Sequence, residues 1–243
     1  MIEIRRLSKR NRDGTLALDD ISISVRAGES HCLVGSAESG RPTLIGVCLS
    51  AIRPTSGEVL IAGVDVVRRP VQARRLVAFA GSHASLYGSL TIRQNVEFFT
   101  RLAGVHNAAA PGVVENGLRW AGVPERHFDV TLRNVGSGTA VLAWFAIASV
   151  RDTPVVILAD PTRGVSPRTR LAMQDCVADL RAQGKAILAT TTDLAFASAF
   201  DRIGVFHAGR IVAERSSAEV MNQSLAQFAL ELGGQLPLDP NHS

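Results

Sequence analysis

A turn bounded by two glycines, between an apolar stretch and a helix-like stretch, is the feature that most constrains this chain. Residues 32–45 read CLVGSAESGRPTLI, which predicts a buried strand, a turn and the start of a helix. Gly35 and Gly40 stand five positions apart, as in the pattern G-x-x-x-x-G-K-[ST], whose backbone N–H groups surround a phosphate at a helix N-terminus. The spacing therefore predicts a phosphate-binding loop between a strand and a helix.

The loop keeps the frame of that pattern but loses its characteristic side chains. Arg41 stands at the lysine position, Pro42 stands where a hydroxyl would bind magnesium, and Glu38 adds a carboxylate. Proline has no N–H group, although its fixed φ suits a first helical turn. We therefore expect the local fold to persist while the phosphate chemistry is lost. The candidate nucleotide-binding residues are Gly35, Ser36, Ala37, Glu38, Ser39, Gly40, Arg41, Pro42 and Thr43.

Composition indicates a globular protein and argues against several other classes. The 243 residues are 46% hydrophobic and 20% charged, which is enough for a sizeable core. The net charge of +4 comes almost entirely from scattered arginines, so we expect no nucleic-acid partner. The longest apolar run, 140–150, is shorter than the ~20 residues that cross a bilayer. No apolar segment follows the strand-like residues 1–6, so we expect a cytoplasmic protein.

Cysteines, histidines and tryptophans are all expected to be structural. Cys32, Cys48 and Cys176 are widely spaced in apolar settings, which is typical of small core residues. The histidines show no ligand spacing, so we predict no metal site. Trp120 and Trp144 fall in helical apolar patterns, which favours a place in the core over stacking on a nucleotide.

Hydrophobic periodicity predicts an α/β fold. Alternation with period two over about the first thirty residues, broken by a turn at 11–14, predicts an antiparallel strand pair. Further strands are expected at 31–34, 59–64, 76–80, 155–158, 186–190, 203–206 and 211–214, the last two as a hairpin. Helices are expected at 43–52, 90–99, 113–121, 167–183 and 224–232. Because strands alternate with helices, we predict a mostly parallel sheet.

The order of these pieces resembles the nucleotide-binding subunit of ATP-binding cassette (ABC) transporters along nearly the whole chain. The likeness is strongest in LTIRQNVEFFTRLAG (90–104), VVILADPTRGVSP (155–167) and FDRIGVFHAGRIVAE (200–214), and SLAQFALELGG is similar to the end of exporter-type subunits. The resemblance implies one cassette over 1–243: a P-loop NTPase-like, mostly parallel core at about 1–81 and 147–220 with an N-terminal antiparallel β subdomain, a helical subdomain at about 82–146, and a C-terminal helix and tail at about 221–243.

Most catalytic positions that the resemblance implies hold other residues here. The positions of the adenine-stacking aromatic, the magnesium-sensing glutamine, the magnesium-binding aspartate, the next loop's aspartate and the γ-phosphate histidine fall on Asn11, Ser82, Ala159, Ser166 and Thr192. The glutamate that polarises the attacking water corresponds to Asp160, which is the catalytic candidate. The signature that contacts the partner subunit's nucleotide falls on 135–139, where Gly136, Ser137 and Gly138 remain signature-like.

These departures predict a catalytically degenerate subunit. We expect Arg41 to pair with Glu38 or Asp160 and thereby neutralise the phosphate pocket. ATP would then bind weakly at best, and no Mg²⁺ site is expected.

The resemblance also implies partners and a location. An integral membrane permease is the expected partner, with a second ABC ATPase subunit as a further candidate, and the chain would lie peripherally on the cytoplasmic face of the membrane. The permease would dock in a groove between the loop 82–87 and the helical insert. Two alternatives stay open: a weakly active ATP-hydrolysing subunit with Asp160 as base, and a cytosolic scaffold that serves no transporter.

Overall fold

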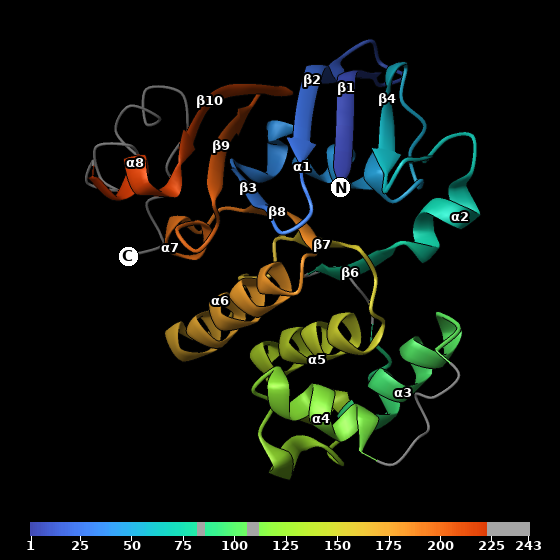
Figure 1. The fold of residues 1–243 in the computed structure, drawn as a ribbon, viewed down its shortest axis with the longest axis vertical. Coiled ribbons are helices and arrows are strands. Elements are labelled where there is room, and N and C mark those ends of the chain that lie inside the picture. Colours follow the sequence, from blue (N-terminus) through green and yellow to red (C-terminus); the bar gives the residue numbers. More distant parts are fainter. Residues whose placement is uncertain (82–85, 106–111, 223–243) are drawn as a thin grey trace.

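The computed structural model describes residues 1–81, 86–105 and 112–222, which form an α/β fold with two sheets (Figure 1). The antiparallel sheet has the order β2-β1-β4-β5 and the mixed sheet the order β10-β9-β3-β8-β7-β6. The first contains β1 (Ile2–Arg10), β2 (Leu16–Val25), β4 (Ser56–Ile61) and β5 (Val64–Asp65). The second contains β3 (Ser30–Val34), β6 (Val77–Gly81), β7 (Val155–Ala159), β8 (Ala186–Thr191), β9 (Arg202–His207) and β10 (Arg210–Ser216).

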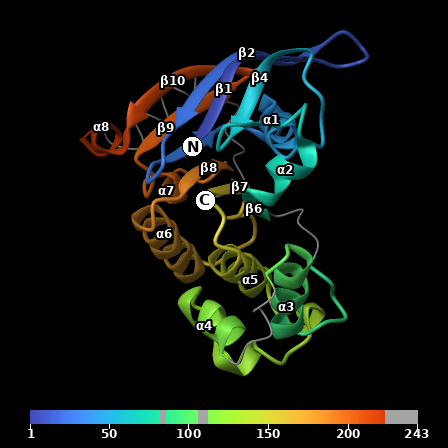
Figure 2. The ribbon, with the colours of Figure 1, turned by 45° about the vertical axis from the view of Figure 1, so that its right-hand side comes forward.

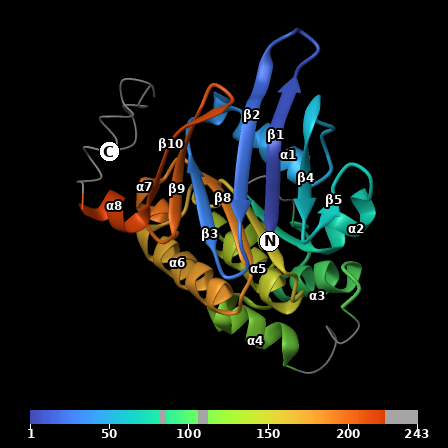
Figure 3. The ribbon, with the colours of Figure 1, turned by 45° about the horizontal axis from the view of Figure 1, so that its top comes forward.

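Helices cover both faces of the mixed sheet (Figures 2 and 3). They are α1 (Arg41–Cys48), α2 (Pro70–Arg75), α3 (Ile92–Leu102), α4 (Val113–Trp120), α5 (Ser137–Val150), α6 (Pro167–Ala182), α7 (Leu194–Ala197) and α8 (Ser217–Asn222). Short 3₁₀ turns span Ala37–Ser39, Glu125–His127 and Leu132–Asn134. In Figure 2, α3, α4 and α5 gather on the side of the mixed sheet away from the antiparallel sheet.

Two hydrophobic clusters hold these layers together. One joins the inner face of the antiparallel sheet, α1 and one face of the mixed sheet, and it includes Ile4, Leu44 and Leu188. The other joins the opposite face of the mixed sheet to α3–α6 and includes Val96, Phe145 and Val177. The parallel strands are buried on both faces, which explains their continuous apolar runs. The predicted fold class is therefore confirmed.

Several predicted element boundaries were wrong for identifiable reasons. The strand expected at 59–64 is two strands, because Ala62 and Gly63 take positive φ angles and turn the chain between β4 and β5. The helix expected at 43–52 begins earlier, at Arg41, because Pro42 fits a first helical turn, and it ends at Cys48. Sequence periodicity also missed the short helices α2, α7 and α8.

The helical region is anchored by a capping box and by one long buried helix. The Thr91 side chain accepts from the Gln94 N–H and the Gln94 side chain accepts from the Thr91 N–H, which fixes the start of α3. α5 runs from the signature-like residues to Val150, across the boundary predicted near residue 146. The predicted helix at 224–232 lies outside the described residues. In the described part of the chain, every helix is too short or too polar to cross a bilayer.

Candidate functional site

The loop between β3 and α1 has the geometry that its two glycines predict. Gly40 has a φ of 101°, in the left-handed region, and directly precedes α1. A Cβ atom at Gly40 would lie 2.2 Å from the Ala17 carbonyl oxygen, and one at Gly35 would lie 2.2 Å from the Phe206 carbonyl oxygen. Both glycines are therefore required by the close approach of β2 and β9, independently of any bound phosphate.

Backbone and side-chain hydrogen bonds to the Ser36 carbonyl close this loop upon itself. The Ser36 carbonyl accepts from the Ser39 N–H at 3.2 Å, from the Ser39 Oγ at 2.7 Å and from the Arg41 Nε at 3.2 Å. The Gly35 N–H donates to the Thr191 carbonyl at 3.3 Å. A phosphate cradle needs free N–H groups directed at the anion. Here two of those donors are already used, and the Ser36 carbonyl faces the guanidinium.

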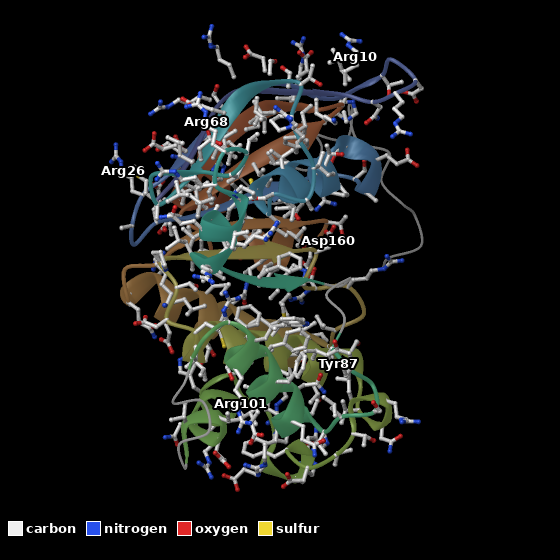
Figure 4. The ribbon with its side chains drawn as sticks, turned by 90° about the vertical axis from the view of Figure 1, so that its right-hand side faces the viewer. Arg10, Arg26, Arg68, Tyr87, Arg101 and Asp160 are labelled. Atoms are coloured by element: carbon white, nitrogen blue, oxygen red, sulfur yellow. The ribbon has the colours of Figure 1, made fainter. Side chains whose placement is uncertain are left out.

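An ion pair between Arg41 and Asp160 bridges the loop and the central strand. Arg41 is fully buried at the start of α1, and its Nη1 lies 2.8 Å from Asp160 Oδ1. Asp160 directly follows β7, and 28% of its side chain is exposed. Glu38, the other predicted partner, is exposed and has no ion pair among the described residues. The expected pairing of Arg41 is thus confirmed, with Asp160 as the partner (Figure 4 labels Asp160).

The pair is held by one strong contact and leaves part of the guanidinium unsatisfied. Arg41 Nη2 is buried and has no hydrogen-bond partner in the described part of the chain. Asp160 has a φ of 46°, and its N–H donates to the Thr190 carbonyl at 2.8 Å. A non-glycine residue in this backbone region is strained, and it keeps this conformation only where its surroundings enforce it. The neighbouring strand β8 therefore fixes the position from which Asp160 reaches Arg41.

The residues around the pair provide few oxygen ligands for a cation. Pro42 and Ala159, at the positions where the resemblance implies magnesium ligands, have apolar side chains. Thr43 is half-buried in the first turn of α1. The Asp193 carboxylate caps α7 and pairs with Arg170 at 2.9 Å, so it is engaged elsewhere. Among the described residues, no cluster of histidine, cysteine and acidic side chains could hold a metal ion.

The signature-like residues lie at the start of α5, as expected for a helix start, and contact the loop before α6. Ser137 is the first residue of α5, and its Oγ donates to the Gly164 carbonyl. A Cβ atom at Gly138 would lie 2.9 Å from Thr169 Oγ1. Ser166 caps α6 by accepting from the Thr169 N–H at 3.2 Å. Residues at these two nucleotide-related positions therefore serve the packing of α5 against α6.

The remaining sequence predictions have mixed outcomes. Asn11 bonds Thr15 within the turn between β1 and β2, and Ser82 lies outside the described residues. The three cysteines are buried and free, as predicted, and burial raises the pKa of the Cys48 thiol to about 12. Trp144 packs against Phe99 in the core with ring centroids 4.9 Å apart, as predicted.

Sequence reasoning missed one component of the site. The Ser36 carbonyl oxygen is a backbone acceptor, and any residue type would supply it. Its position was set only by the 3₁₀ turn at Ala37–Ser39, which the sequence pattern did not predict.

Comparisons with known proteins agree with this fold. A family model described as "ABC transporter" matches residues 18–163. Nod factor export ATP-binding protein I of Burkholderia orbicola is 30% identical over 237 residues, which cover 97% of this chain and 77% of the relative. The doxorubicin resistance ATP-binding protein DrrA of Mycobacterium tuberculosis is 32% identical over 224 residues, which cover 86% of this chain but only 63% of that relative, less than two thirds of its length.

Solved structures give the same fold. A dimeric ATP-binding cassette in a post-hydrolysis state bound to ADP and Pi has a TM-score of 0.80 at 21% identity, covering 89% of this chain and 99% of that chain. The ATP-binding subunit of an ABC transporter has a TM-score of 0.80 at 24% identity, covering 96% of this chain and 99% of that chain. From the family model, the relatives and the fold together, this chain belongs to the ABC transporter family and has the fold of its ATP-binding cassette.

Proposed function

We propose that this chain is the nucleotide-binding subunit of an ABC exporter and that its own catalytic site is degenerate. The observation that carries the proposal is the Arg41–Asp160 ion pair, which places a protein carboxylate on the cation that should meet a phosphate. The two relatives are named for Nod factor export and for doxorubicin resistance, which supports the exporter class. Their substrates do not transfer to this chain, because a membrane partner selects what is moved.

The charges of the site oppose ATP. Arg41 and Asp160 neutralise each other, while Glu38 is exposed on the loop without an ion pair among the described residues and would repel an approaching polyphosphate. Two like charges ~4 Å apart repel by about 4 kcal/mol at an effective dielectric of roughly 20, before screening by salt. Even half of that repulsion weakens binding more than tenfold. The residues at this loop therefore do not fit a tightly bound ATP.

The same residues do not fit Mg²⁺ either. A phosphoryl-transfer site needs a hard cation between protein oxygens and the phosphates. Pro42 and Ala159 supply no oxygen from their side chains, and the Asp160 carboxylate is engaged by Arg41. We therefore assign this subunit a structural or regulatory role, with hydrolysis left to a second, competent ATPase subunit in the same transporter.

An exposed apolar surface on α3 and on the segment just before it supports a permease as the partner. Tyr87 and Phe98 are exposed and meet edge to face with ring centroids 5.0 Å apart, and Leu102 on the same helix is 72% exposed. The buried Asn95 fixes this surface by accepting from the Tyr87 N–H at 2.7 Å and donating to the Tyr87 carbonyl at 3.0 Å. Exposed apolar patches of this kind mark interaction sites. Docking there would place the subunit on the cytoplasmic face of the membrane.

Phosphate release and ATP titration by calorimetry, both with Mg²⁺, test the proposal. We expect the purified wild-type chain to release no phosphate and to bind no ATP in the micromolar range. A variant with Arg41→Lys, Pro42→Thr, Ala159→Asp and Asp160→Glu should bind ATP more tightly. It restores the lysine of the loop pattern and both side-chain oxygen ligands for Mg²⁺. Wild-type turnover near the ~1 to 100 s⁻¹ of kinases, abolished by Asp160→Asn, would instead establish the active-enzyme alternative.

A further inference from the structure

The antiparallel sheet carries a cavity of about 910 Å³. It lies over β1, β4 and the chain segments that flank them, and its lining includes Arg5, Arg6, Arg53 and Arg68. Figure 4 labels Arg68 beside this sheet and Asp160 beside the mixed sheet, so the cavity does not belong to the loop described above. Its volume falls within the ~300 to 1,000 Å³ of small-molecule sites.

A bulge in β1 brings two consecutive arginines to this cavity. Ile4 and Leu7 are both buried although they are three positions apart, so strict alternation is broken between them. The pairings of β1 with β2 and with β4 both shift register at this point. Arg5 and Arg6 are consequently both exposed on the outer face. Bulges redirect side chains in this way and are frequent beside functional sites.

The bulge is stabilised by specific contacts from both neighbouring strands. Arg6 has a φ of 44°, and its N–H donates to Ser22 Oγ on β2 at 3.0 Å. Reciprocally, Asp20 on β2 has a φ of 53°, and its N–H donates to Ser8 Oγ at 3.1 Å. On β4, a Cβ atom at Gly57 would lie 2.3 Å from the Arg6 carbonyl oxygen. Strained backbone held by several independent contacts points to a functional reason for the geometry.

Two of the four arginines have no counter-charge among the described residues. Arg5 pairs with Glu58 at 2.8 Å, and Arg68 lies 3.5 Å from Asp65. In the part of the chain that the structure describes, Arg6 and Arg53 have no carboxylate within ion-pair distance, and both are exposed.

The segment that carries Arg53 is also held in place. Lys9 Nζ donates to the Arg53 carbonyl at 2.8 Å, and the Arg10 N–H donates to Thr55 Oγ1 at 2.9 Å. The cavity therefore has two guanidinium groups that no described carboxylate pairs with, on segments that are fixed before any ligand arrives.

We propose that this cavity binds a small phosphorylated molecule whose phosphate is held by Arg6 and Arg53. A phosphomonoester carries about −1.5 to −2 charges near neutral pH, which two unpaired guanidinium groups match. Guanidinium groups bind phosphate oxygens in a bidentate geometry. The carboxylates of Asp20 and Glu58 also line the cavity and accept hydrogen bonds from hydroxyl groups of the same ligand.

Calorimetric titration of the full chain with glycerol phosphate tests this site, because the probe carries both a phosphate and hydroxyl groups. The test variant is Arg6→Gln with Arg53→Gln, which keeps the Arg6 N–H bond to Ser22. The matched control is Arg12→Gln with Arg26→Gln, which removes the same charge from exposed positions outside the cavity lining. Thermal melting of all three proteins checks that each is folded.

We expect binding to the wild type and to the control, and a loss of affinity of about tenfold or more in the test variant. Absence of wild-type binding would overturn the proposal, as would equal losses in both variants, which would indicate general electrostatic attraction. Binding that is unaffected in the test variant would also overturn it, since the phosphate would then lie elsewhere. None of these outcomes depends on whether the chain hydrolyses ATP.

Discussion

The sign of the change in unfolding free energy caused by Asp160→Asn should show whether this site is built for catalysis or for stability. Asparagine tolerates the left-handed backbone of residue 160, where φ is 46°, so the change removes a charge with little strain in the chain. In an active site, a catalytic carboxylate is held at a cost in stability, and its removal is usually neutral or stabilising. In a neutralised cradle, the same change leaves the buried Arg41 without its counter-charge.

The structure gives the expected size of the effect. Removing one partner of a fully buried ion pair costs ~3 to 5 kcal/mol. Asp160 is 28% exposed, and the asparagine carboxamide oxygen can still accept from Arg41 Nη1, which lies 2.8 Å from Asp160 Oδ1 in the wild type. Both facts reduce the loss, so we expect Asp160→Asn to lower the free energy of unfolding by about 2 kcal/mol. For a chain of this length, that corresponds to a fall of about 4 to 8 °C in the melting temperature.

Thermal melting of the wild type, Asp160→Asn, Arg41→Met and the double variant provides the assay. If the pair stabilises the fold, the double variant should be less destabilised than the sum of the single changes, with a coupling free energy above ~1 kcal/mol. The matched control is Asp20→Asn, because Asp20 is exposed, also has a positive φ (53°) and has no ion pair among the described residues, whereas Asp152 is unsuitable because it pairs with the buried Lys185 at 3.1 Å. A melting temperature raised by Asp160→Asn would refute our interpretation of the pair.

Single substitutions at three other residues test the packing of the loop, the pH dependence of stability and the docking surface. Gly40→Ala should destabilise the chain by more than ~2 kcal/mol in urea unfolding, because its Cβ would meet the Ala17 carbonyl at 2.2 Å and its φ is 101°. Burial and Arg202 lower the pKa of His31 to about 3, so the unfolded chain binds a proton that the folded chain excludes. Stability should therefore fall as the pH drops below ~6.5, by up to ~1.4 kcal/mol per pH unit, and this slope should flatten in His31→Gln. Leu102→Glu should reduce co-purification with the permease, while Leu171→Glu, at another exposed leucine on α6, should not.

The structure also shows which side chain is unsuitable for testing permease docking. Charge reversal at Arg93 would be a natural choice from the sequence, because this residue lies in 90–104, one of the stretches that resemble the family most strongly. In the fold, Arg93 pairs with Asp129 at 2.8 Å and with Glu115, and it lies over the Phe128 ring. Its reversal would disrupt the helical region itself, so weaker docking of that variant would not identify a contact.

The fold was predictable from sequence because its central elements have strong local patterns. The run Val155–Leu158 is apolar throughout, as a strand covered on both faces requires, and the strand that the structure places there ends one residue later. The boundaries were less predictable where tertiary contacts decide them. The turn at Ala62 and Gly63 divides an apolar run that looks like one strand, since periodicity does not register a positive φ at alanine.

The site was only partly predictable for a similar reason. The sequence limited the partner of Arg41 to two acidic residues, but it could not choose between Glu38, three positions away, and Asp160, on another strand. The choice depends on where the loop backbone directs the Arg41 side chain. The 3₁₀ turn aims the Ser36 carbonyl at the Arg41 Nε, and this contact directs the guanidinium toward β7 and away from solvent.

The packing of this loop is consistent with our proposal that a phosphate-binding frame persists here without phosphate chemistry. Gly35 and Gly40 are fixed by backbone atoms of β9 and β2, so both glycines are needed whether or not a nucleotide binds. Arg41 and Asp160 are fixed by each other, because a fully buried guanidinium without a counter-charge is strongly destabilising. The residues that make the sequence resemble an active loop are thus held by packing and by charge neutralisation. Glycine spacing alone therefore cannot distinguish an active cassette from a degenerate one, and our proposal of degeneracy rests on the pairing of residues 41 and 160.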